Sequence, residues 1–474
     1  MEQFEARLDA WIASHQGEIV AHAMDLIQIP SICKFTPDAE HPFGEGCAAA
    51  LDYMLRLAGQ LGLETRNYDY YAGAARLPGR TQKTIGIFVH LDTAPSSDMW
   101  TFRPFEPEVR NGYLIGIGAQ DNKGTAVTML YLLRCLRELE VRLEHTILLV
   151  FGCGKKAEMQ DVEYFLQCEP EPEISLIADA GFPVCLGEKG SLNFEFRCPV
   201  AETRMVDFRA GRASNMVPDQ AFALLKGLDY QQVETRLRSD VRCSVVPVGP
   251  FVKIAAGGLG GHAAFPEHTH SPIPVLAEIL LENGYADDGS APVLRFLRNT
   301  YDTCLGAPLH VDVRDEIFGY TTHVCGLVRM KDGILTQTVN IRYVPELNQE
   351  EIVRRVRAVG EAAGMQFQLL SNPPPHTLQP HLQPIASMLT AVANRVLGVR
   401  LHDYTMGGVT YAKKVPNAIA FGPNRDDLPT PVGIGRGSGH TADEVMRIQN
   451  LDDGLKIYAL SLLRIDPIVI EGVI

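Results

Sequence analysis

The chain has 474 residues, of which 46% are hydrophobic and 21% charged, a composition typical of a globular protein long enough for two domains. Its net charge of −14, without a dense Lys/Arg cluster, excludes nucleic-acid binding. Apolar runs fall short of the roughly 20 residues that span a bilayer, and Met1 to Ile19 lacks the pattern of a signal peptide. Ten cysteines without a C-x-x-C pair indicate reduced, mostly buried thiols. We therefore expect a cytoplasmic protein with no membrane partner.

Helix and strand patterns alternate through the first part of the chain. In chain order they predict a helix over 47–61, a strand over 85–89, a helix over 124–139, and strands over 146–151 and 174–178. This alternation predicts an α/β fold with a mixed, mostly parallel sheet and helices on both faces. Ligands of such sheets bind at the carboxyl ends of strands, so His90, the segment 152–156 and Asp179 should converge at one edge.

The sequence changes character near Glu188. Alternation over 191–196, a glycine-rich stretch over 255–261, a helix over 272–281 and a strand over 336–343 predict an inserted α+β domain over 189–376. The prolines at 373–375 stiffen the return connection. Residues 1–188 and 377–474 would form the catalytic domain, with further elements predicted over 384–397 (helix), 418–421 (strand) and 451–463 (helix).

Several polar residues are candidates for catalysis or metal binding. His90 and Asp92 stand two apart at a strand end and share a face, so Asp92 can orient the imidazole. Asp121 directly precedes a helix and could instead cap it. Asp179 has no local motif, and His440, after the Gly/Pro-rich loop 422–439, could be a ligand or a capping histidine. The prediction of a site therefore depends on the order and flanks of these residues.

In that order and context the chain resembles the co-catalytic zinc metallopeptidases of family M20, which include carnosinase, acetylornithine deacetylase and bacterial dipeptidases, and most closely the dipeptidase V branch. The resemblance extends over nearly the whole chain. The segments that carry it include Ile29-Pro30-Ser31, His90-Leu91-Asp92-Thr93-Ala94-Pro95, Asp121-Asn122-Lys123-Gly124, Glu188-Lys189-Gly190, Asn215-Met216-Val217-Pro218-Asp219, Asn340-Ile341-Arg342-Tyr343 and Gly407-Gly408-Val409-Thr410-Tyr411-Ala412. The resemblance implies a catalytic domain with an inserted lid, in a chain that we expect to be monomeric.

The resemblance also implies a role for each candidate in the catalytic domain. One metal ion, zinc or manganese, would be bound by residues matching His90, Asp121 and Asp179. A second ion would be bound by Asp121 as a bridge, a glutamate and His440. Two such ions share a water and stabilise the oxyanion. Asp92 matches the acid that supports the first histidine.

Three residues of the inserted domain match substrate-contacting positions. His262 matches a histidine that assists the oxyanion, although beside glycines it could be an ordinary loop histidine. Asn215 and Arg342 match residues that hold the terminal carboxylate of the substrate, which a guanidinium can bind through two hydrogen bonds. The expected ligand is a small peptide or an N-acyl amino acid.

The chain departs from the family where members carry Asp-Glu-Glu, the first glutamate being the general base and the second a metal ligand. Here the aligned residues are Gly154-Lys155-Lys156, and Glu158 comes two residues too late to replace a ligand. In the family site, two divalent ions offset most of the negative charge of the carboxylates. Here fewer carboxylates remain, and two ammonium groups bring the site to the same net charge. Cations beside these lysines would be repelled. We therefore expect at most one ion, or none.

This departure leaves three interpretations open. The chain could hydrolyse small peptides, with a neutral Lys155 as the base that activates a water on one remaining ion. It could instead be a pseudo-peptidase that binds small peptides through Asn215 and Arg342 without cleavage. Both lysines could also simply point to solvent.

Overall fold

The computed structural model describes residues 2–96, 99–263, 266–301, 303–433 and 435–470. The chain forms two compact units. Unit 1 comprises Met1–Leu186, Thr377–Tyr404 and Val409–Ile474, and unit 2 comprises Gly187–His376 and Thr405–Gly408. The sequence patterns predict the division at 188/189 and 376/377. Among the described residues, no helix is long and apolar enough to cross a membrane.

The main sheet of unit 1 has a parallel centre of buried, apolar strands. These central strands are, in spatial order, β6 (Thr146–Gly152), β3 (Thr84–His90), β7 (Ile174–Ile177) and β24 (Ala418–Phe421). They are flanked by antiparallel pairings that involve β1 (Glu64–Tyr68), β2 (Ala72–Leu77) and β9 (Val184–Glu188). The short strands β22 (His376–Thr377) and β23 (Tyr404–Met406) complete the sheet beside β9. The predicted mixed, mostly parallel α/β class is confirmed.

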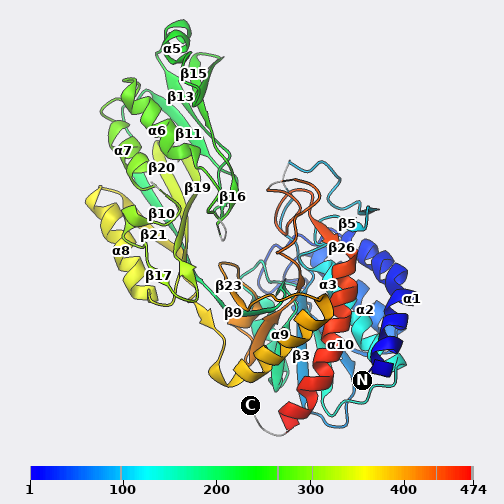
Figure 1. Ribbon diagram of the computed structural model, residues 1–474. Coiled ribbons are helices and arrows are strands. Elements are labelled where there is room, and N and C mark those ends of the chain that lie inside the picture. The colour runs from blue at the N-terminus through cyan, green and yellow to red at the C-terminus, as the bar shows by residue number, and fades with distance from the viewer. Residues whose placement is uncertain (1, 97–98, 264–265, 302, 434, 471–474) are drawn as a thin grey trace. The chain divides into compact units, whose positions relative to one another are not determined.

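The helices of unit 1 pack against the sheet and against one another (Figure 1). They are α1 (Glu2–Ile27), α2 (Glu45–Gln60), α3 (Lys123–Glu138), α4 (Gln160–Cys168), α9 (Gln383–Leu397) and α10 (Ile448–Ile470). Helix α1 is absent from our sequence predictions. It buries an apolar stripe at helical spacing that begins with Leu8, Trp11 and Ile12. Many acidic and polar residues occupy its other face, so the apolar stripe is weak in the sequence.

Unit 2 contains an antiparallel sheet with its own apolar core. Its strands are, in spatial order, β14 (Cys243–Val248), β15 (Phe251–Gly257), β13 (Gln220–Lys226), β11 (Met205–Ala210), β19 (Thr322–Lys331), β20 (Ile334–Tyr343), β10 (Gly190–Pro199) and β21 (Gln366–Ser371). Its helices are α5 (Tyr230–Leu237), α6 (Pro272–Glu282), α7 (Ala291–Asn299) and α8 (Gln349–Ala362). The predicted helix over 272–281 is α6, which Ser271 caps by accepting the backbone N–H of Ile273.

Among the described residues, four small sheets order the connecting loops. They are β4 (Glu108–Arg110), β5 (Tyr113–Ile115) and β26 (Val445–Arg447); β8 (Ala180–Gly181) and β25 (Pro423–Asn424); β12 (Met216–Val217) and β16 (Gly261–His262); and β17 (Arg314–Asp315) and β18 (Gly319–Tyr320). The first of them holds the segment after His440, because β26 pairs with β5 immediately before α10 begins.

No disulfide joins the ten cysteines, all of which lie among the described residues. Five are buried and five are partly exposed, so the expectation of mostly buried thiols is only half right. The buried ones are Cys47, Cys135, Cys153, Cys185 and Cys325.

Candidate active site

Loops at the carboxyl ends of neighbouring parallel strands bring the predicted residues of unit 1 together. His90 is the last residue of β3, Lys155 follows the end of β6, and Asp179 follows β7. Asp121 lies two residues before the start of α3, and His440 comes from the loop before β26. Ligand atoms of His90, Asp121 and Asp179 all lie within 4.8 Å of one another. The convergence expected from the α/β pattern is therefore observed.

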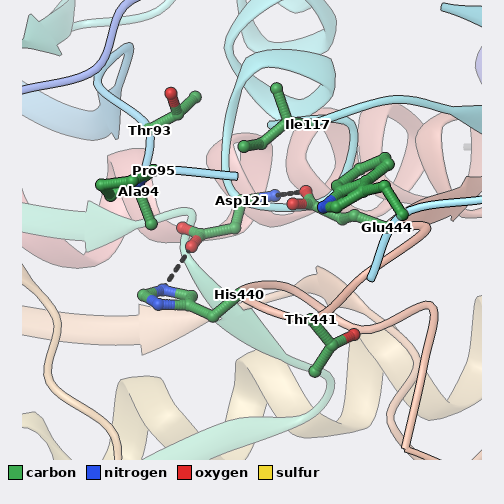
Figure 2. Close-up of a pocket in the computed structure, with 9 residues that line it drawn as sticks. Thr93, Ala94, Pro95, Ile117, Asp121, His440, Thr441 and Glu444 are labelled. Carbon is green, nitrogen blue, oxygen red and sulfur yellow. Dashed lines mark hydrogen bonds and ion pairs between the residues drawn. The ribbon is translucent and has the colours of Figure 1, made fainter. Parts of the chain in front are cut away.

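The carboxylate of Asp121 is the centre of the site. Its Oδ1 lies 2.7 Å from Nε2 of His90 and 3.6 Å from Nζ of Lys155. Its Oδ2 lies 2.7 Å from Nζ of Lys156 and 2.6 Å from Nε2 of His440. Figure 2 shows the Asp121 and His440 side chains pointing toward each other. Asp121 thus contacts basic groups rather than capping α3, whose N-cap is Asn122.

The two lysines point into the site. Nζ of Lys155 forms an ion pair with Oδ2 of Asp179. Nζ of Lys156 lies 2.8 Å from Nε2 of His440. The Lys155 and Lys156 side chains are only 11% and 15% exposed, so the interpretation that both lysines face solvent is wrong. Glu158, in contrast, is exposed and lies outside this cluster.

The carboxylates and the basic groups shift one another's ionisation. Burial raises the pKa of Asp121, but Lys156 and Lys155 hold that pKa well below its ordinary value. Burial lowers the pKa of His90, but Asp121 and Asp179 raise it to about 10. Burial also lowers the pKa of Lys155, and the same two carboxylates more than reverse that shift and raise the pKa above its ordinary value. Lys155 is thereby disfavoured as the neutral base that one interpretation requires.

Asp92 supports both His90 and the lysine turn. Its backbone carbonyl lies 2.9 Å from Nδ1 of His90, and its Oδ1 lies 3.3 Å from the same nitrogen. The two carboxylate oxygens also accept the backbone N–H groups of Lys155 at 3.2 Å and Lys156 at 2.8 Å. The supporting role that the sequence predicts for Asp92 thus extends to fixing the turn after β6.

Residues that the sequence analysis does not single out hold the same loops. Asp161 accepts the backbone N–H of Gly154 at 2.7 Å and a hydrogen bond from the hydroxyl of Tyr411. Burial and the nearby Asp92 raise the pKa of Asp161 to about 6. Asn122 donates from Nδ2 to the backbone carbonyl of Ala178 at 2.8 Å. The position of Asn122, next to the central carboxylate and before a helix, is a signal that could have identified it.

Glu444 lies behind the central carboxylate. Its Oε1 accepts the backbone N–H groups of Gln120 at 2.8 Å and Asp121 at 2.9 Å. Burial and the charge of Asp121 raise the pKa of Glu444 to about 7. Glu444 also lines a small pocket that opens beside Asp121 and His440 (Figure 2). Its spacing of four residues after His440 is the sequence signal for this role.

The three predicted substrate contacts lie in unit 2 and are linked to one another there. Asn215 directly precedes β12, and its carbonyl accepts the N–H of Ala263 at 2.9 Å. His262 belongs to β16, which pairs with β12, although its side chain lies outside the described part. Thr322, which pairs with Arg342 in the sheet, donates from its hydroxyl to the carbonyl of Ala263 at 3.0 Å.

Arg342 is almost fully buried in β20. Its Nε donates to Oδ1 of Asn340 at 2.9 Å. Burial lowers the pKa of Arg342 to about 10, against the opposing effect of Glu188. A buried guanidinium is stabilised when it pairs with a carboxylate, because the partner neutralises its charge while the group stays out of water.

The two predicted metal positions differ in their donors. His90, Asp121 and Asp179 are suitable ligands for one divalent ion, although Lys155 contacts two of them. At the other position the chain offers Asp121 and His440, and the ammonium group of Lys156 contacts both of them. The residues present therefore fit one ion at most, and they do not fit the second.

Comparisons with known proteins agree with this geometry. The sequence model of peptidase family M20/M25/M40 matches residues 86–464. "Putative dipeptidase YtjP" of Bacillus subtilis is 27% identical over 460 residues, which cover 94% of this chain and 96% of that protein.

Two solved structures share the fold. The di-peptidase Dug1p of Saccharomyces cerevisiae matches with a TM-score of 0.61 and 13% identity, and the match covers 98% of both chains. Human carnosine dipeptidase 1 matches with a TM-score of 0.59 and 15% identity, and the match covers 98% of this chain and all 100% of the other. Because the family match extends over most of the chain, the protein belongs to peptidase family M20/M25/M40.

Proposed function

We propose that this chain acts on small peptides, or similar N-acyl amino acids, that end in a free carboxylate. The observation that carries the proposal is the group of His90, Asp121 and Asp179, whose ligand atoms gather within 4.8 Å in a chain that belongs to a peptidase family. The full-length similarity to a protein named as a putative dipeptidase supports the same class of substrate.

The first candidate activity is hydrolysis of the peptide bond. A zinc or manganese ion held by His90, Asp121 and Asp179 would supply an acidified water. The chain's own residues would do the rest. Asp92 orients His90 through the contacts at Nδ1, and Arg342 is suited to hold the carboxylate of the substrate.

The second candidate activity is binding without cleavage. It is favoured by the lysine turn, because Lys155 and Lys156 replace a general base and a metal ligand by ammonium groups that are already paired with carboxylates. The raised pKa of Lys155 favours the same candidate, since a protonated amine cannot take a proton from water.

A single set of measurements separates these candidates. The chain, purified without chelators, is incubated with a dipeptide panel and Mn²⁺ or Zn²⁺, while new amino groups are measured and thermal shifts are recorded. Release of amino acids that disappears in D121N supports hydrolysis. A thermal shift by dipeptides, but not by their C-terminal amides, without any product supports binding alone. Absence of both product and shift across the panel would refute the proposal.

A further inference from the structure

The central carboxylate divides the site into two cation positions. The first lies between Oδ1 of Asp121 and Oδ2 of Asp179, and Nζ of Lys155 contacts both oxygens. The second lies between Oδ2 of Asp121 and Nε2 of His440, and Nζ of Lys156 contacts both atoms, at 2.7 and 2.8 Å. These pairs of atoms belong to the residues that the family resemblance assigns to the two metal ions.

We infer that the ammonium groups of Lys155 and Lys156 replace the two metal ions, so that the folded chain neutralises its own carboxylates and excludes divalent cations from both positions. Each lysine stands in one position and bonds to the donors of that position. The chain thus carries the two positive charges on its own side chains, which favours binding without cleavage over hydrolysis with a bound ion.

Electrostatics opposes a metal ion beside these lysines. A divalent ion that enters the second position meets the ammonium of Lys156 within the same small set of donors, and the two repel each other strongly in a poorly solvated site. To leave, Lys156 must give up its contacts with Asp121 and His440. At the first position the ion must displace Lys155, whose side chain is only 11% exposed and is paired with Asp179.

The backbone of the turn holds both lysines in place. The N–H groups of Lys155 and Lys156 donate to the two oxygens of Asp92, and the N–H of Gly154 donates to Asp161. Both acceptors are fully buried. Three backbone hydrogen bonds to buried carboxylates therefore fix the turn. A movement of the backbone that carried the lysines out of the site would break all three.

A second observation indicates that the turn has been remodelled around the lysines. Gly154 stands where the family resemblance expects an aspartate, and a Cβ atom placed on it would lie 2.3 Å from Cε1 of Phe43. Phe43 is a buried core residue and cannot simply move aside. The packing of this turn thus accepts glycine and rejects the acidic side chain that accompanies the metal ligands in the family.

Metal titration of the full-length chain tests the inference without any peptide, so its result is independent of the proposed substrate. The wild-type chain is compared with K155M/K156M, which removes the charges, and with K155E/K156E, which also adds carboxylates. A matched control, K83E, changes an exposed lysine that pairs with Glu173. Bound Mn²⁺ and Zn²⁺ are counted by mass spectrometry after desalting, and affinities are measured by calorimetry.

We expect the wild type and K83E to retain almost no metal, K155M/K156M to gain about one equivalent on His90, Asp121 and Asp179, and K155E/K156E to gain up to about two. The affinity for Mn²⁺ should rise at least about 100-fold from wild type to K155E/K156E. One or more tightly bound equivalents on the wild type would overturn the inference. If a double variant does not fold, Mn²⁺ titration of the wild type by electron paramagnetic resonance decides alone: an unchanged free-ion signal supports the inference, and loss of one or more equivalents of free ion overturns it.

Discussion

The neighbouring strands β3 and β6 contribute different kinds of residue to one site at their carboxyl ends. At the end of β3, the imidazole of His90 contacts the backbone carbonyl and the carboxylate of Asp92 and belongs to a group that could hold a metal ion. At the end of β6, Lys155 and Lys156 place two ammonium groups among the carboxylates of the same site. We infer from this comparison that the carboxylates require positive charge and that side chains, rather than bound ions, supply it here.

Replacing the central carboxylate should have the largest effect on this arrangement. D121N leaves Lys156 and His440 facing a neutral amide and removes one partner of Lys155. Because an uncompensated buried charge is costly, we expect D121N to lower the free energy of unfolding by about 3–5 kcal/mol. Urea unfolding measures this change.

The matched control is D9N, since Asp9 also pairs with a lysine, Lys456, but has a side chain that is 53% exposed. D9N should change stability by less than about 1 kcal/mol. Equal effects of D121N and D9N would mean that the lysines do not depend on the central carboxylate.

The carboxyl group that anchors the lysine turn should make stability depend on pH. The pKa of Asp161 in the folded chain, about 6, lies above its value in the unfolded chain, so stability falls as pH rises from about 4 to about 7. D161N lacks this ionisation. The stability of wild type relative to D161N should therefore fall by about 3 kcal/mol over that range, as measured by urea unfolding at each pH. A pH-independent difference would contradict the assigned burial of this carboxyl group.

Packing against the turn provides a smaller effect. G154A places a methyl group against the ring of Phe43, and we expect a loss of about 1–3 kcal/mol of stability. The control is G59A in helix α2, where an added Cβ meets no atom within 4 Å. Alanine at this position should stabilise the helix by up to about 1 kcal/mol. Thermal unfolding of both variants measures the pair. A neutral G154A would show that the turn can accept the side chain.

The weakest expected effect lies in unit 2. R342K keeps the charge but loses the planar fork that suits a carboxylate, so the affinity for dipeptides should fall about tenfold. Affinity for the corresponding C-terminal amides should change little. Calorimetry with both ligand types makes the comparison, and an equal loss for acids and amides would remove Arg342 from the proposed carboxylate contact.

Much of the fold follows from short apolar patterns in the sequence. The runs that become β3, β6 and β7 are continuous and apolar because buried parallel strands are covered on both faces. The sequence patterns do not predict helix α1, because polar residues interrupt its apolar stripe. Its burial also depends on contacts with α3 and α10, which come much later in the chain.

The site is predictable in its residues but not in its contacts. The convergence of strand ends at one edge of the sheet identifies His90 and Asp179. Asp121 and His440 are identified only through the family resemblance. The direction of each lysine is not encoded in these signals. It depends on backbone hydrogen bonds to Asp92 and on tertiary contacts such as the one between Gly154 and Phe43.

Anomalous diffraction from crystals of the wild-type chain soaked in Zn²⁺ tests the replacement of metal by lysine most directly. The account predicts density for Nζ of Lys156 between Asp121 and His440, with no anomalous peak there. Two zinc peaks about 3.5–4 Å apart, with both amines turned away, would contradict it.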